Sequence, residues 1–140
     1  MKSRETSAHA HTVLLVEDDP DTRDAMQALL KAHGYAVVCA FDGTEALSLA
    51  RREPRPCVIL LDLTLPRMDG YEFRRQQRAD PAIADIPVVA VSGMDDLARR
   101  ALLLQVPAYM QKPPDIEHLM ATLDRLCDHG RPTDPGTTSL

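Results

Sequence analysis

Five short apolar runs alternate with helix-like segments along almost the whole chain, and this alternation constrains the fold more than any other feature. Most of the runs are continuous rather than alternating in polarity, which is typical of strands covered on both faces in a parallel sheet. Five such strand–helix units predict an α/β fold with an open, doubly wound sheet, although the residues alone leave the strand order open. The runs are Thr12–Val16, Tyr35–Ala40, Cys57–Leu61, Pro87–Ser92 and Ala108–Met110.

Capping signals mark where the intervening helices begin and end. Asp19 can cap a first helix with Pro20 in its first turn, and Gly34 can end it. Two pairs have the spacing of a capping box: Asp42 with Glu45 before the second helix, where Pro54 is the predicted stop, and Asp69 with Glu72 before a more polar third helix. The fourth and fifth helices are predicted from apolar residues at helical spacing. These residues are Leu97, Ala98, Ala101 and Leu102, then Ile116, Leu119, Met120, Leu123, Leu126 and Cys127, with Gly130 ending the last helix.

Length and composition favour one globular domain in the cytoplasm. The 140 residues carry a formal net charge of −5 without a basic cluster, which gives little support to nucleic-acid binding. No apolar run approaches the ~20 residues of a membrane span, and the polar N-terminus is unlike a secretory signal. We expect a domain over residues 12–129, with flexible ends at 1–11 and 130–140. The distant cysteines, Cys39, Cys57 and Cys127, are interpreted as small buried hydrophobic residues rather than as a redox or metal site.

Charged and hydroxyl side chains follow the apolar runs at the point where each predicted strand ends. Glu17, Asp18 and Asp19 follow the first run, Asp62 follows the third, Ser92 closes the fourth, and Lys112 comes shortly after the fifth. In doubly wound sheets the ligand site lies outside the carboxyl ends of the strands, so these groups should converge. Clustered carboxylates favour a hard divalent cation such as Mg²⁺, and a lysine and a hydroxyl beside them suit phosphoryl transfer.

Four segments resemble the receiver domains of two-component response regulators, including chemotaxis regulators that consist of this domain alone. Val13–Arg23 resembles the opening of these domains with its acidic strand end, and Cys57–Gly70 resembles their phosphorylation signature. Ile86–Ser92 resembles their strand that ends in a Thr/Ser switch residue, and Tyr109–Pro113 resembles their aromatic–Lys–Pro ending. The resemblance runs from about Thr12 to Cys127 and implies a flavodoxin-like fold, with five helices around five parallel strands in the order 2-1-3-4-5.

The resemblance also implies a role for each acidic residue of the constellation. Asp62 is the implied nucleophile, which accepts a phosphoryl group from the phosphohistidine of a sensor kinase or a phosphotransfer protein. Asp18 is the implied direct ligand of Mg²⁺, Glu17 acts mainly through water, and Asp62 and the backbone carbonyl of Thr64 complete the protein ligands. Asp19 is then a helix cap rather than a ligand.

The remaining implied roles concern the signal. Lys112 pairs with the phosphoryl group, Ser92 donates to it, and Tyr109 turns inward as Ser92 moves. The Lys112–Pro113 peptide bond is implied to be cis. The surface that changes is expected to be residues 94–126, as a partner-binding or dimerising face without direct nucleic-acid or membrane contact.

One departure from the family pattern affects that face. The family has a glycine shortly before the aromatic residue, at the end of the fourth helix, whereas this chain has Leu104–Tyr109 with Pro107 inside. Glycine tolerates positive φ, so this chain must build the turn differently.

Three other interpretations remain open. A phosphatase of the haloacid-dehalogenase kind also uses an aspartyl nucleophile and Mg²⁺, but it needs a second acid where this chain has Thr64. A phosphorylation-independent interaction module is disfavoured because the acceptor, the acids and the lysine are all present. The third interpretation is a receiver domain excised from a hybrid kinase or a longer regulator. Nucleotide binding finds no glycine-rich phosphate loop, and the expected role is signalling rather than enzymatic.

Overall fold

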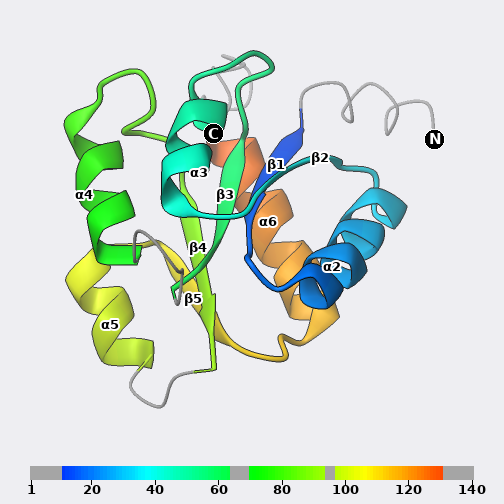
Figure 1. Cartoon of the computed structure of the whole chain (residues 1–140). Helices are drawn as coiled ribbons and strands as arrows, with labels where there is room; N and C mark the ends of the chain where they lie inside the picture. The colour runs from blue at the N-terminus through cyan, green and yellow to red at the C-terminus, as the bar shows by residue number, and fades with distance from the viewer. Residues whose placement is uncertain (1–10, 64–69, 94–96, 131–140) are drawn as a thin grey trace, which may run out of the picture.

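Five parallel strands form one sheet in the order β2-β1-β3-β4-β5, which confirms the predicted topology (Figure 1). The structure, a computed structural model, describes residues 11–63, 70–93 and 97–130. The predicted flexible ends therefore lie almost wholly outside the described residues, as do Thr64 and Asp69. The strands are β1 (Thr12–Val16), β2 (Ala36–Ala40), β3 (Val58–Asp62), β4 (Val88–Ser92) and β5 (Ala108–Gln111).

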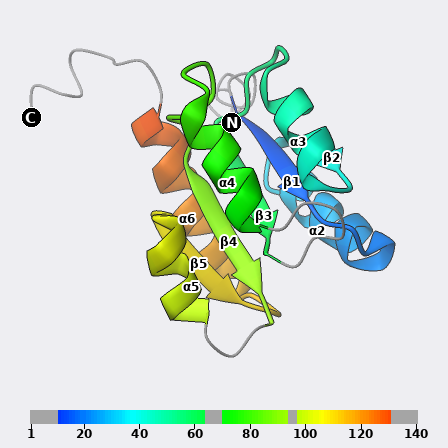
Figure 2. The same cartoon turned by 60° about the vertical axis from the view of Figure 1, so that its left-hand side comes forward.

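Each strand is followed by a helix, and the helices cover both faces of the sheet (Figures 1 and 2). The helices are α2 (Pro20–Ala32), α3 (Gly43–Ala50), α4 (Gly70–Ala79), α5 (Leu97–Leu104) and α6 (Ile116–Gly130). Two separate buried clusters result, one under α3 and α4 and the other under α6. Within the residues that the structure describes, no helix is long and apolar enough to cross a bilayer.

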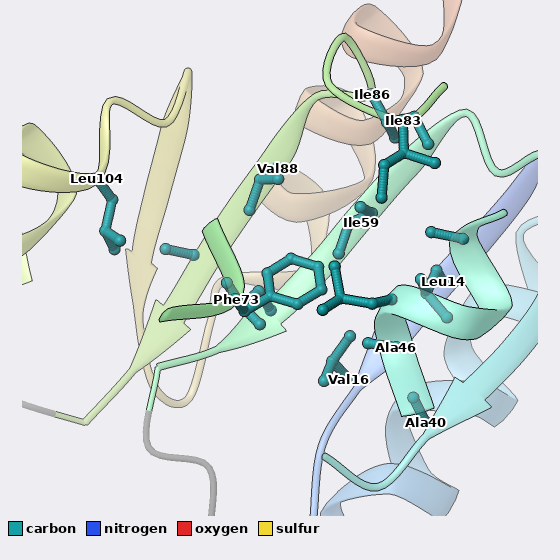
Figure 3. Close-up of a cluster of buried hydrophobic side chains, with 14 of the residues drawn as sticks. Leu14, Val16, Ala40, Ala46, Ile59, Phe73, Ile83, Ile86, Val88 and Leu104 are labelled. Carbon is teal, nitrogen blue, oxygen red and sulfur yellow. The ribbon is translucent and has the colours of Figure 1, made fainter. Parts of the chain in front are cut away.

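Alternate residues of the central strands point to opposite clusters, which explains why their sequences are apolar without interruption. Leu14 and Val16 of β1 join the cluster around Phe73 (Figure 3), whereas Val13 and Leu15 join the cluster beneath α6. Parallel strands buried on both faces need an apolar residue at every position.

Two of the predicted helix starts are confirmed by their caps. Asp19 accepts a hydrogen bond from the Thr22 backbone N–H at 2.8 Å, at the start of α2. Asp42 accepts one from the Glu45 N–H at 2.9 Å, at the start of α3. The Glu45 carboxylate then accepts from the N–H of Phe41 at 2.7 Å. The predicted end of α3 at Pro54 is too late, because the helix already ends at Ala50 and a turn follows it.

In the turn between α5 and β5, a residue in the left-handed conformation stands in for the missing glycine, and hydrogen bonds from an arginine on α4 hold the turn. Gln105 adopts φ 58°, a left-handed conformation that costs a non-glycine residue about 1 kcal/mol or more. The Arg74 guanidinium on α4 donates to the carbonyl oxygens of Leu104 at 2.9 Å and Gln105 at 2.6 Å. These carbonyls lie at a helix end and lack intrahelical partners, so Arg74 stabilises the turn that glycine would otherwise make.

The pairing of Cys57 with Cys127 corrects the interpretation of the cysteines. Their sulfur atoms form a disulfide between the residue before β3 and the inward face of α6. Cys39 remains a free, partly buried thiol, as predicted for a small packing residue. The 70-residue separation gave no sign of the pairing, because contact depends on how α6 lies across the sheet.

A buried glutamine connects α4 to the segment before β4 and gives a stability prediction. The fully buried Gln77 amide donates to the carbonyls of Ile83 and Ile86, each at 2.9 Å, and accepts from Arg74 at 2.7 Å. Gln77→Ala leaves these groups unsatisfied beside a cavity, so we expect a loss of about 2–4 kcal/mol in unfolding free energy. Urea denaturation measures it.

The neighbouring Gln76→Ala is the matched control for that measurement. Gln76 is only partly buried, and its amide donates to Glu72 one turn earlier on the same helix at 2.7 Å. Its replacement should cost about 0.5 kcal/mol or less. Equal losses in the two variants would show that the buried bonds of Gln77 do not stabilise the fold.

Candidate functional site

The strand register brings the predicted site residues to one edge of the sheet, the lower edge in Figure 1. Val16 pairs with Leu61, so Glu17 and Asp62 lie side by side just beyond those residues. Ser92 pairs with Gln111, which places Lys112 one residue beyond the end of β5. The ends of four strands therefore bring Glu17, Asp62, Ser92 and Lys112 to one edge, as the sequence predicts.

Lys112 bridges the two buried carboxylates of this edge. Its Nζ lies 2.9 Å from Glu17 Oε1 and 3.3 Å from Asp62 Oδ2. Glu17 is 4% exposed and Asp62 is 6% exposed, so both acids depend on a nearby positive charge. Lys112 itself is only partly buried, and its ammonium group can reach a ligand that approaches the edge.

The pKa shifts indicate that Lys112 alone does not compensate the negative charge of the buried carboxylates. Burial raises the pKa of Glu17 above its usual value, and the charge of Asp62 adds to the rise, while hydrogen bonds from Lys112 and the Asp19 N–H oppose it. Burial alone would lower the pKa of Lys112, but its hydrogen bond to Glu17 and the charges of Asp62 and Glu17 outweigh burial and raise it. The lysine is therefore held protonated, and the carboxylates would gain from a further cation.

Three carboxylates form a group that fits a divalent cation. One oxygen from each of Glu17, Asp18 and Asp62 lies within 4.8 Å of the others, with Asp18 exposed and the other two buried. An all-oxygen set with an open, exposed side suits Mg²⁺, which retains several of its waters. The expected fourth ligand, the carbonyl of Thr64, lies outside the described residues.

Asp19 is a helix cap, as predicted, and does not belong to the carboxylate group. Its side chain accepts from the Thr22 N–H and, at 2.6 Å, from the Thr22 hydroxyl. These hydrogen bonds hold the pKa of Asp19 below its usual value. Its backbone N–H donates to Glu17 Oε2 at 3.2 Å, so the start of α2 also orients the buried acid.

The residues predicted to carry the signal lie on β4 and β5. Ser92 is 1% exposed at the end of β4, and its carbonyl accepts from the Lys112 N–H at 3.0 Å. Tyr109 on β5 is 47% exposed and so does not occupy the inward position.

The Lys112–Pro113 bond is cis, as the family resemblance implies. Glu53–Pro54 is a second cis bond, which the sequence did not suggest.

An arginine beside the site was missed by the sequence analysis. Arg23 on α2 donates from Nη1 to the backbone carbonyl of Glu17 at 3.2 Å, and its guanidinium lies 4.4 Å from the ring centre of Phe41. Arg23 thus ties α2 to the end of β1 and to the exposed ring after β2. Sequence spacing alone does not show that this guanidinium turns back to the Glu17 carbonyl six residues earlier.

An apolar cavity of about 660 Å³ adjoins the same edge, between α2 and the connection from β5 to α6. Met26 and Leu29 line it from α2, and Pro114 and Ile116 line it from the other side. Lys112 and Asp62 also border the cavity, so a molecule bound there would contact the site.

Substitution of the two adjacent acids distinguishes ligand from cap. We expect Asp18→Ala to abolish Mg²⁺ binding, because it removes one of three clustered carboxylates. Asp19→Ala should keep most of the Mg²⁺ affinity and instead cost about 1 kcal/mol of unfolding free energy, since it removes an N-cap. Isothermal titration and urea denaturation measure the two effects. The reverse order of Mg²⁺ affinities would mean that Asp19, not Asp18, holds the metal.

The chain belongs to the response regulator receiver domain family, whose sequence pattern matches residues 13–124. Response regulator MprA of Mycobacterium leprae (strain TN) is 35% identical over 124 residues, which cover 87% of this chain and 53% of MprA. MprA of Mycobacterium tuberculosis (strain ATCC 25618 / H37Rv) is 34% identical over the same length and share. The chain thus spans about half the length of the curated relatives it matches.

Solved receiver domains share the fold. The receiver domain of a signal transduction histidine kinase from Syntrophus aciditrophicus superposes with a TM-score of 0.79 at 27% identity, covering 89% of this chain and 95% of that one. The receiver domain of sensor histidine kinase PA1611 from Pseudomonas aeruginosa PAO1 has a TM-score of 0.77 at 32% identity, covering 84% and 98%. That structure holds a magnesium ion in its active-site cleft. Chemotaxis protein CheY4 of Vibrio cholerae gives 0.74 at 29% identity, covering 83% and 98%.

Proposed function

We propose that this domain is a Mg²⁺-dependent phosphoacceptor in two-component or phosphorelay signalling, and that Asp62 receives the phosphoryl group. The observation that carries the proposal is the buried Asp62 carboxylate, which shares Lys112 with Glu17 at the edge of the sheet. A partly buried lysine beside a carboxylate nucleophile, with a second acid available for a cation, matches the needs of phosphoryl transfer.

The chemistry follows from the positions of these groups. An Asp62 oxygen attacks the phosphorus of a phosphohistidine, the phosphorus–nitrogen bond breaks, and the histidine leaves with the electron pair. Lys112 neutralises one phosphoryl oxygen and Ser92 donates to another. Glu17, Asp18 and Asp62, with the Thr64 carbonyl, would hold the Mg²⁺, which would supply charge neutralisation.

The partners implied by this chemistry are a sensor histidine kinase or a histidine phosphotransfer protein, and a downstream protein target. The added phosphoryl group brings roughly −1.5 to −2 charges to the site. Movement of Ser92 toward it leaves space that Tyr109 can fill from its exposed position, which would change the face formed by residues 94–126. This face binds the target or a second copy of the chain, in the cytoplasm.

A receiver domain within a longer protein is the second candidate context. Two of the structural neighbours are receiver domains of histidine kinases, and the curated relatives extend well beyond the matched region. The proposed chemistry at Asp62 is the same in either context, and only the output differs.

Incubation with acetyl phosphate tests the proposed function without a cognate kinase. We expect the intact mass to rise by one phosphate in the presence of Mg²⁺ and to remain unchanged when EDTA removes the metal, because the buried carboxylates need a cation before an anionic phosphate can approach. No gain of phosphate in the presence of Mg²⁺, by a protein shown to be folded, would contradict the proposed function.

A further inference from the structure

The disulfide lies at the end of the sheet opposite the phosphoacceptor site. Cys57 directly precedes β3, whose other end carries Asp62, and Cys127 lies near the end of α6, whose beginning follows Lys112. Figures 1 and 2 place this end of α6 beside the amino-terminal ends of the central strands. The disulfide therefore joins the far ends of β3, which carries Asp62 at its near end, and of α6, which begins four residues after Lys112.

The covalent loop closed by this bond contains one functional half of the domain. Residues 57–127 include Asp62, Ser92, Tyr109 and Lys112, together with α4, α5 and β5. The acidic residues Glu17 and Asp18 lie outside the loop. The cross-link thus fixes the end of α6 to the start of β3, in a loop that contains the phosphoacceptor and the proposed signalling face, whereas two of the three clustered carboxylates lie outside it.

We propose that Cys57 and Cys127 are a reversible thiol–disulfide modification site, which sets how far the response to phosphorylation extends into α6. The effect on the response rests on the proposed function. Cytosolic disulfides in mesophiles are usually transient and redox-sensing rather than structural, so in the cytoplasmic setting of the proposed function this disulfide points to such a site. Cys57 is only partly buried, whereas Cys127 is fully buried, so exchange begins at Cys57.

Oxidation requires a low-molecular-weight disulfide such as glutathione disulfide as the oxidant. The Cys57 thiolate attacks one sulfur of that disulfide, forms a mixed disulfide and releases one thiolate. The Cys127 thiolate then attacks the Cys57 sulfur and releases the second thiolate, and the two cysteine protons end on the two released thiols. A dithiol reductant reverses both steps.

The expected consequence follows from how α6 is held. Leu119, Met120 and Leu123 pack α6 against the sheet without fixing it covalently. In the oxidised form the Cα atoms of Cys57 and Cys127 are 5.0 Å apart and linked, so the end of α6 cannot slide past β3. The reduced form lacks this restraint, and a displacement that starts at Lys112 can pass along the whole helix.

Thiol counting tests the modification itself. The fully reduced chain should show three reactive thiols when denatured, and after incubation of the folded protein with glutathione disulfide it should show one, at Cys39. Burial raises the pKa of the Cys39 thiol, which keeps it a poor nucleophile and makes it the internal control. Three remaining thiols, or glutathione on Cys39 with the other two unchanged, would overturn the proposal.

Hydrogen exchange with and without beryllofluoride, an aspartyl-phosphate mimic, tests the coupling in the presence of Mg²⁺. The oxidised protein should lose the response of α6 that the chemically reduced protein shows, while β5 responds in both. Cys57→Ala/Cys127→Ala should behave as the reduced form, and Cys39→Ser should retain the redox dependence. Equal responses of α6 in both redox states would overturn this inference alone. Absence of any response in both states would overturn it together with the proposed signalling face.

Discussion

Asp62→Asn is expected to take up no phosphate from acetyl phosphate under conditions in which the unmodified domain gains one phosphate. An amide oxygen is a far weaker nucleophile than a carboxylate, and the substitution keeps the size and shape of a side chain that is 6% exposed. Lys112 retains Glu17 as its partner at 2.9 Å, so the site should keep its structure. Intact-mass spectrometry of both proteins, with circular dichroism as the test of folding, measures the difference.

Asp42→Asn is the matched control for this loss. Asp42 is also a buried carboxylate that follows a strand of the same sheet, but it caps α3 instead of contacting Lys112. Asparagine is as good an N-cap as aspartate, so the variant should fold and gain phosphate as the unmodified domain does. Equal phosphorylation of Asp62→Asn, or loss of phosphorylation in Asp42→Asn alone, would place the acceptor elsewhere.

Loss of the disulfide should produce the largest change in stability. Cross-linking over 70 residues restricts the unfolded chain, and the loop-entropy relation gives about 4 kcal/mol for a loop of this length. Reduction, or Cys57→Ala/Cys127→Ala, should lower the unfolding free energy by an amount of this order. The midpoint of thermal unfolding should fall by about 10 °C or more for a domain of this size.

Two control variants distinguish the effect of the cross-link on stability from any effect of the free thiol. Cys39→Ser removes the free thiol and should retain both the disulfide and the sensitivity to reductant. Reductant should have no effect on Cys57→Ala/Cys127→Ala, which has no cross-link to lose. If oxidised and reduced wild-type protein unfold at the same temperature, the loop restraint does not contribute to stability.

The fold and the phosphoacceptor edge could be predicted because each rests on local sequence signals. Strands buried on both faces need continuous apolar runs, and these runs located every strand. The carboxyl ends of parallel strands meet at one edge, so Glu17, Asp62 and Lys112 could be brought together without knowing any distance. The cap at Asp19 was predictable for the same reason, since an N-cap interacts with residues two or three positions away.

Two of the features that could not be predicted depend on contacts between elements that are distant in the sequence. The disulfide requires α6 to lie across β3 so that Cys127 reaches Cys57, and sequence spacing does not set that position. The hydrogen bond from Arg74 to the turn at Gln105 joins segments about 30 residues apart, and an arginine on a polar helix gives no sign of it in the sequence. The sequence did identify that turn as the place where the family's glycine is missing.

Chemical identification of the modified residue tests the central claim most directly. The domain is phosphorylated with acetyl phosphate and Mg²⁺, and borohydride then reduces the acyl phosphate of an aspartate to homoserine. Peptide mass spectrometry locates the new residue. The proposed chemistry predicts homoserine at position 62 and at no other aspartate. Homoserine at another position, or a borohydride-resistant phosphate on Ser92 or on a histidine, would contradict the assignment of Asp62 as the phosphoacceptor.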